Sequence, residues 1–300
     1  MPLHAWTSAR FRVPLPAGHR FPIEKYALLR DAVLGSGVVA PEHLHEPARV
    51  PVDALLRAHT HDYVTRVTGG ALSPHEIRRV GFPWSAMLVE RALRAAGGTL
   101  EAAQHALGAG VAMNLAGGTH HAFADRGEGF CVFNDVVVAI RQLQFYGRIQ
   151  RAAVIDLDVH QGNGTHAMLA DDPRVVTFSM HGRRNYPFHK VPGTLDIELD
   201  DGTGDDEYLA CLADALPTVL ARSRPDLVLY LAGADPHEGD RLGRLRLTFD
   251  GLARRDAMVL DACRDVGIPV AIVIAGGYGR DIQTTVEVHR RTAAIAAEYT

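Results

Sequence analysis

The sequence predicts a single-domain α/β protein built on an open, mainly parallel sheet with helices on both faces. Short apolar segments alternate along the chain with longer stretches of helical spacing, and polar clusters follow four of the apolar segments. Strands that alternate with helices usually form a parallel sheet that is covered on both sides. No repeat, low-complexity tract or linker interrupts this order, so we expect one domain over residues 1–300.

The individual elements follow from periodicity. Helices are predicted where Ala, Leu and Arg recur at three- to four-residue spacing, over residues 84–107, 132–146, 205–222 and 249–266. Strands are predicted where short runs are apolar and rich in β-branched residues, over residues 111–115, 152–158, 174–180, 226–232 and 269–275. Residues 181–204 contain many loop formers and are expected to be a long loop.

Composition excludes several classes of protein. The chain is 47% hydrophobic and 22% charged, and its net charge of −4 does not indicate a surface that binds nucleic acid. Its three cysteines, Cys131, Cys211 and Cys263, are too few and too scattered for a disulfide framework or a cysteine-type zinc site. No signal-like segment and no run of 18 apolar residues occurs, so we expect a cytoplasmic protein without a membrane span.

Polar clusters lie directly after four of the predicted strands. They read "AGGTHHAF", "DVHQGNG", "AGADPHEGD" and "AGGYGRD" in chain order. Open parallel sheets bind their ligands at the carboxyl ends of the strands, so these loops should meet at one edge. Together they supply metal ligands, bases and a phenol donor: His120, His121, Asp156, Asp158, His160, Asp235 and Tyr278.

The alternation of Asp156, Asp158 and His160 indicates a metal ion. In an extended segment these three side chains project to one face, where two carboxylates need a positive charge nearby. A strand-end cap with a hydrogen-bonded histidine is the structural alternative, and Asp235 taken alone could equally cap a turn. The adjacent pair His120–His121 favours catalysis, because neighbouring side chains diverge and cannot share one apolar pocket.

The remaining histidines form no comparable pattern in the sequence. We expect most of them on the surface or in loops, including His43, His45, His59, His61 and His105.

Five ordered motifs resemble the histone deacetylase superfamily of zinc-dependent amidohydrolases: "GGTHHAF", "GEGFCVFND", "DLDVHQGNGT", "AGADPHEGDRLG" and "GGYG". "RVGFPWS" and "EGDRLGRLRLT" are similar to the class IV branch of that superfamily. The resemblance covers most of the chain. It implies an arginase/deacetylase-like sheet of eight strands, in agreement with the fold class that periodicity predicts.

The resemblance also implies roles for the clustered residues. Asp158, His160 and Asp235 would bind Zn²⁺, or Fe²⁺ in the cell. His121 would be the general base, and His120 would assist as an acid or electrostatic stabiliser. Asp156 would orient His120, and Tyr278 would donate to the oxyanion. Asn163 stands behind His121 where some branches have aspartate, which should keep the imidazole neutral to lower pH.

Two further sets of residues are implied by the resemblance. A potassium ion found in many family members would be bound by side-chain or backbone atoms of Asp156, Asp158, His160, Ser179 and Met180. A narrow substrate tunnel would be formed by Gly129, Phe130, Tyr186, Phe188, Gly276 and Gly277.

The implied activity is metal-assisted hydrolysis of the amide in acyl-lysine proteins or peptides. The class IV resemblance implies long fatty-acyl groups in preference to acetyl. An acetylpolyamine amidohydrolase is the closest alternative, whereas an arginase-like ureohydrolase would need two metals and more carboxylates. A non-catalytic acyl-lysine sensor would not need two histidine bases and an oxyanion donor.

Overall fold

Eight strands form one sheet in the order β2-β1-β3-β8-β7-β4-β5-β6, and every neighbouring pair is parallel. The computed structural model describes residues 1–300. Its strands are β1 (Ala5–Trp6), β2 (Leu44–His45), β3 (Val111–Asn114), β4 (Ala152–Asp156), β5 (Val175–Gly182), β6 (Leu195–Leu199), β7 (Leu227–Leu231) and β8 (Val270–Val273). The predicted α/β class and the implied eight strands are confirmed, and the sheet is parallel throughout.

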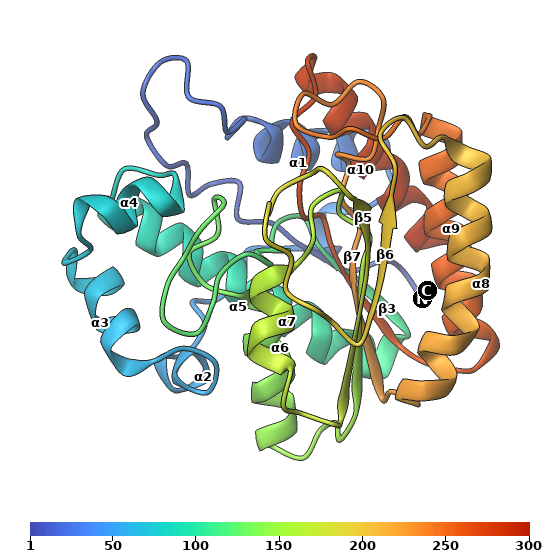
Figure 1. Cartoon of the computed structure of the whole chain (residues 1–300), viewed down its shortest axis with the longest axis horizontal. Helices are drawn as coiled ribbons and strands as arrows, with labels where there is room; N and C mark the ends of the chain where they lie inside the picture. The colour runs from blue at the N-terminus through green and yellow to red at the C-terminus, as the bar shows by residue number, and fades with distance from the viewer.

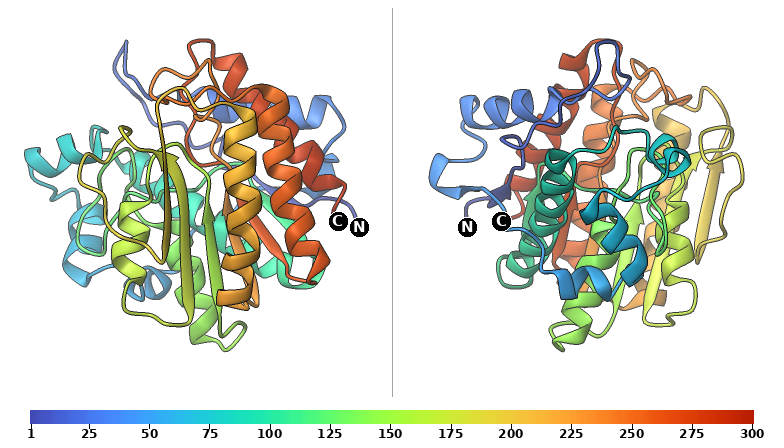
Figure 2. Two further views of the ribbon diagram at one scale, coloured as in Figure 1. Left: turned by 45° about the vertical axis from the view of Figure 1, so that its right-hand side comes forward. Right: turned by 90° about the vertical axis from the view of Figure 1, so that its left-hand side faces the viewer.

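Helices cover both faces of the sheet (Figure 1, Figure 2). They are α1 (Lys25–Gly35), α2 (Val52–Leu56), α3 (His61–Gly69), α4 (Pro74–Val80), α5 (Ala86–Ala109), α6 (Asp135–Phe145), α7 (Asn163–Leu169), α8 (Asp205–Ser223), α9 (Phe249–Asp265) and α10 (Ile282–Ala297). Helices α8, α9 and α10 lie on one face, and α5, α6 and α7 lie on the other. None of the helices has the length and apolar character needed to cross a membrane.

The predicted elements in the middle of the sheet are confirmed. Strands β3, β4, β7 and β8 are buried at every residue, which is why they read as continuous apolar runs. Three of the four predicted helices begin at a side chain that accepts a backbone N–H, namely Ser85, Asn134 and Thr248. The carboxyl ends of the central strands therefore lie side by side, as the motif pattern requires.

Elements at the periphery differ from the prediction. Residues 181–204 were expected to form a loop but contain β6, an edge strand in which apolar residues alternate with Asp196 and Glu198. Strands β1 and β2 have two residues each, too few for a periodic signal. Helix α10 is rich in Thr, Val and Ile, which weakens its helical pattern in the sequence.

His59 lies in the loop between α2 and α3, in agreement with the expectation that the remaining histidines belong to the surface or to loops. Its side chain is buried, with Nδ1 bonded to the carbonyl of Phe123 (3.0 Å) and Nε2 accepting the N–H of Asn134 (3.0 Å). The histidines at 43, 45 and 105 are half-buried and surround His4 at the sheet edge, with ring centroids 4.2–5.1 Å from that of His4.

Candidate metal centre and substrate cavity

The metal-ligand candidates meet because β4 and β7 are neighbours. Asp156 at the end of β4 lies opposite Leu231 at the end of β7, so the loops that follow run together. Asp158 and His160 in the first loop and Asp235 in the second are all buried, and their ligand atoms lie within 4.8 Å of one another. His160 Nδ1 is 2.9 Å from Asp158 Oδ1 and 3.2 Å from Asp235 Oδ2.

This cluster has the properties of a cation site. Burial and the neighbouring Asp158 carboxylate raise the pKa of Asp235 to about 7. Asp235 Oδ2 accepts no well-aligned hydrogen bond although it is buried. A Cβ atom on Gly276 would come within 2.0 Å of that oxygen and 2.6 Å of Asp158 Oδ2. Two carboxylates and one imidazole in a space that excludes other side chains fit a divalent zinc or iron ion.

Backbone donors orient both carboxylates. Gly276 N donates to Asp158 Oδ2 (2.7 Å), and Val159 N donates to Asp235 Oδ1 (2.9 Å). These bonds fix the carboxylate positions before any ion binds.

His120 and His121 lie beside the metal ligands, with ring centroids 4.1 Å apart and ring planes tilted by 50°. His120 Nδ1 lies 2.7 Å from Asp156 Oδ2, and His121 Nδ1 lies 2.7 Å from Asn163 Oδ1. Burial opposes a charge on His120, but the carboxylates of Asp156 and Asp158 outweigh it and raise its pKa to about 9. Burial and the neighbouring His120 and His160 lower the pKa of His121 well below its usual value.

The tautomer of His121 follows from a residue that the sequence did not point out, Glu128. Asn163 Nδ2 donates to Glu128 Oε1 (2.8 Å), so Asn163 Oδ1 must face the imidazole and accept from it. His121 therefore carries its proton on Nδ1 and leaves Nε2 with a free lone pair. Glu128 also accepts from the Tyr186 hydroxyl (2.9 Å). Only the tertiary contact identifies Glu128, since "GEG" has no chemical signature.

The residues of the implied potassium site also converge. Asp156 on β4 pairs in register with Ser179 on β5, and Ser179 and Met180 are both fully buried. Asp156 Oδ1 accepts the backbone N–H of Asp158 (3.2 Å).

A cavity of about 270 Å³ opens above the metal cluster. Its walls are formed by Arg78, Arg79, Val80, Gly81, His121, Gly129, Phe130, His160, Tyr186, Leu242 and Tyr278. Gly129 and Phe130 adopt positive φ angles of 58° and 65°, and a Cβ on Gly129 would lie 2.6 Å from the His121 ring. The Tyr278 ring lies 6.0 Å from that of Phe130, and no protein group hydrogen-bonds its hydroxyl.

Three of the six expected tunnel residues do not line this cavity. Phe188 is 83% exposed and is absent from its wall, whereas Tyr186 faces the His121 ring at 4.8 Å. Gly276 lies beneath the two carboxylates, and Gly277 packs against Ala234 and Thr285. Both positions beside the metal cluster favour glycine, because a side chain at either one would collide with its neighbours.

A buried Asp–His–Asp set beside paired histidines, at the carboxyl edge of an open parallel sheet, is typical of metal-dependent hydrolases. The sequence matches the histone deacetylase domain family over residues 19–293, and the chain belongs to this family.

Individual relatives agree with this assignment. The chain is 49% identical over 277 residues to an uncharacterized protein of Picosynechococcus, covering 92% of each. It is 34% identical over 269 residues to histone deacetylase 2 of Arabidopsis thaliana, covering 87% of this chain and 70% of that one. A crystal structure of an HDAC homologue complexed with SAHA superposes with a TM-score of 0.88 at 24% identity, over 100% of this chain and 85% of the other. The class IV resemblance stays a prediction.

Proposed function

We propose that the protein is a metal-dependent amidohydrolase that removes an acyl group from the side-chain amine of lysine. The observation that carries this proposal is the hydrogen-bond chain Glu128–Asn163–His121, which leaves the Nε2 lone pair of His121 free beside the metal ligands. A neutral imidazole in this position is suited to act as a general base.

Zn²⁺, or Fe²⁺, held by Asp158, His160 and Asp235 would supply Lewis-acid activation of the water and the amide carbonyl. His121 Nε2 takes the proton from the attacking water, whose oxygen forms the new bond to the carbonyl carbon. The Tyr278 hydroxyl donates to the carbonyl oxygen as it becomes negative. The C–N bond then breaks, and a protonated histidine returns the proton to the departing lysine amine. Charge on His120, favoured by Asp156, stabilises the negative intermediate.

A structural potassium ion is part of the proposal. Asp156, Asp158, His160, Ser179 and Met180 would provide its oxygen ligands through side-chain and carbonyl groups.

The size of the acyl group divides the proposal into two candidates. An apolar cavity shares the Phe130 ring with the substrate cavity and has a volume of about 50 Å³, roughly that of two water molecules. None of the metal-ligand candidates lines this apolar cavity, so a short acyl group such as acetyl needs no room in it. A long fatty chain, which the class IV resemblance implies, would have to displace the Phe130 and Phe82 side chains, although the apolar lining suits it.

The test is kcat/KM of the zinc-loaded protein for one peptide that carries acetyl-, octanoyl- or myristoyl-lysine. We expect acetyl-lysine to be hydrolysed and the rate to fall by at least 100-fold in His121→Ala. A rise in kcat/KM with chain length would select the long-chain candidate. If the zinc-loaded protein released no acyl group from any of the three peptides, the proposed function would be wrong.

A further inference from the structure

The mouth of the substrate cavity carries two arginines, and neither of them forms an ion pair. Arg78 and Arg79, in the last turn of α4, are exposed and line the cavity. Neither forms an ion pair or a side-chain hydrogen bond, and no Asp or Glu is among the lining residues. The whole chain has 35 acidic and 31 basic residues, so this local excess is opposite in sign to the net charge of −4.

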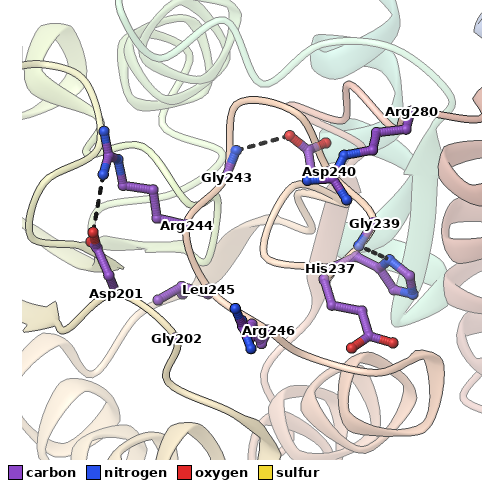
Figure 3. Close-up of a pocket in the computed structure, with 11 residues that line it drawn as sticks. Asp201, Gly202, His237, Gly239, Asp240, Gly243, Arg244, Leu245, Arg246 and Arg280 are labelled. Atoms are coloured by element: carbon purple, nitrogen blue, oxygen red, sulfur yellow. Dashed lines mark hydrogen bonds and ion pairs between the residues drawn. The ribbon is translucent and has the colours of Figure 1, made fainter.

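A second pocket lies against the loop Asp240–Arg244, which also contributes to the wall of the first cavity. Leu242 lines the first cavity, whereas Gly243 and Arg244 line the second, which has a volume of about 900 Å³. Figure 3 shows this second pocket, whose walls are almost entirely polar. Because Leu242 and Gly243 are adjacent, the two pockets flank the same loop, and the second is much larger than a small amine requires.

The charges of the second pocket are nearly balanced. Arg244 bonds to Asp201 (3.0 Å), as Figure 3 shows, and the buried Asp240 accepts the backbone N–H groups of Leu242 and Gly243. Arg246 and Arg280 have no ion pair, and Glu238 is the remaining acidic group. This pocket therefore accepts mixed polar side chains, and the excess of positive charge lies at Arg78 and Arg79.

We infer that the enzyme prefers acyl-lysine in a polypeptide whose neighbouring residues are acidic, and that it discriminates against acylated polyamines. This inference rests on the proposed function. An acidic side chain next to the acyl-lysine lies at the mouth, where the guanidinium groups of Arg78 and Arg79 attract it. An acylated polyamine places further ammonium groups there, and the same guanidinium groups repel them. Because the arginines are exposed and are not among the proposed catalytic groups, the preference should appear in KM and leave kcat unchanged.

The experiment compares acetyl-lysine peptides flanked by Asp with peptides flanked by Lys, together with N-acetylputrescine and N-acetylspermidine. At low salt we expect about a tenfold higher kcat/KM for the acidic peptide, with a smaller ratio at about 0.5 M salt because exposed charges are screened. Arg78→Gln/Arg79→Gln should reduce the ratio to about two. The control variant is Arg148→Gln/Arg222→Gln, which should leave the ratio unchanged. These two arginines are exposed and unpaired, and they precede β4 and β7, near the amino ends of those strands.

Binding separates this inference from the proposed function. Fluorescein-labelled versions of both peptides are titrated into His121→Ala protein and followed by anisotropy, which needs no turnover. Tighter binding of the acidic peptide without hydrolysis by the native protein would contradict the proposed function and support the charge preference. Equal kcat/KM for the two peptides, equal effects of the two double variants, or polyamine turnover as fast as that of the acidic peptide would overturn the inference.

Discussion

Arg255 on α9 ties together the two loops that carry the metal-ligand candidates. Its side chain is fully buried, and Nη1 donates to the carbonyls of Gly233 (2.7 Å) and Leu157 (3.4 Å). Leu157 immediately precedes Asp158, and Gly233 is two residues before Asp235. The guanidinium is neutralised by Asp256, whose Oδ1 accepts from Nε (2.9 Å). One side chain thus sets the spacing between the loops after β4 and β7.

Replacing Arg255 with Met leaves two buried carbonyls without their donor and Asp256 without its cation. Breaking a buried ion pair from one side costs about 3–5 kcal/mol of folding free energy. Asp256 retains the Thr292 hydroxyl as a donor (2.6 Å), so we expect a value near the lower end, about 3 kcal/mol. Loosening the loops should also weaken metal binding by roughly 10- to 100-fold.

Urea unfolding of metal-free protein measures the first quantity, and competition with a chromogenic chelator measures the second. Arg254→Met is the matched control, because Arg254 is the adjacent residue on α9 but is exposed and unpaired. Arg254→Met should change stability by less than about 0.5 kcal/mol. The reasoning is refuted if Arg255→Met unfolds within about 1 kcal/mol of the native protein, or if its metal affinity equals that of Arg254→Met.

Three further predictions concern the site and the core. Tyr278→Phe should lower kcat by about 100-fold or more, because the hydroxyl is proposed to donate to the oxyanion. Metal content and the unfolding midpoint should not change, since the hydroxyl forms no hydrogen bond with a protein group. A near-native kcat would remove Tyr278 from the mechanism. Chelation of the ion should lower Tm by about 4 °C relative to protein with free Zn²⁺ at about 100 times its Kd, and an unchanged Tm would argue against Asp158, His160 and Asp235 as ligands. Burial lowers the pKa of His59 to about 4, so below pH 6.5 the unfolded chain binds a proton that the folded protein excludes. Stability should therefore fall by about 2 kcal/mol from this group between about pH 7 and pH 5. His59→Gln should lack that part of the loss in urea titrations at the two pH values, and an equal loss in both proteins would contradict the assignment.

Local patterns determined the centre of the fold and the composition of the site. Strands β4, β7 and β8 are buried on both faces, so their sequences had to be continuously apolar, and that pattern needs no knowledge of their partners. Polar clusters at the ends of parallel strands share one edge of the sheet. For that reason the order of strands and motifs along the chain was sufficient to predict that Asp158, His160 and Asp235 lie together.

Tertiary structure alone decided the contacts between groups that are distant in the sequence. Glu128 orients Asn163 and thereby His121, Arg255 joins two loops, and His59 is buried between two backbone groups. None of these contacts has a sequence signature, because each depends on where a separate segment lands on the folded sheet. The cavity wall follows the same rule. Phe188 is exposed and does not line the cavity, while Arg78 and Arg79 line it from a helix in another part of the chain. Side-chain periodicity indicates which face of a helix or strand is buried, but it does not indicate which other segment of the chain covers that face.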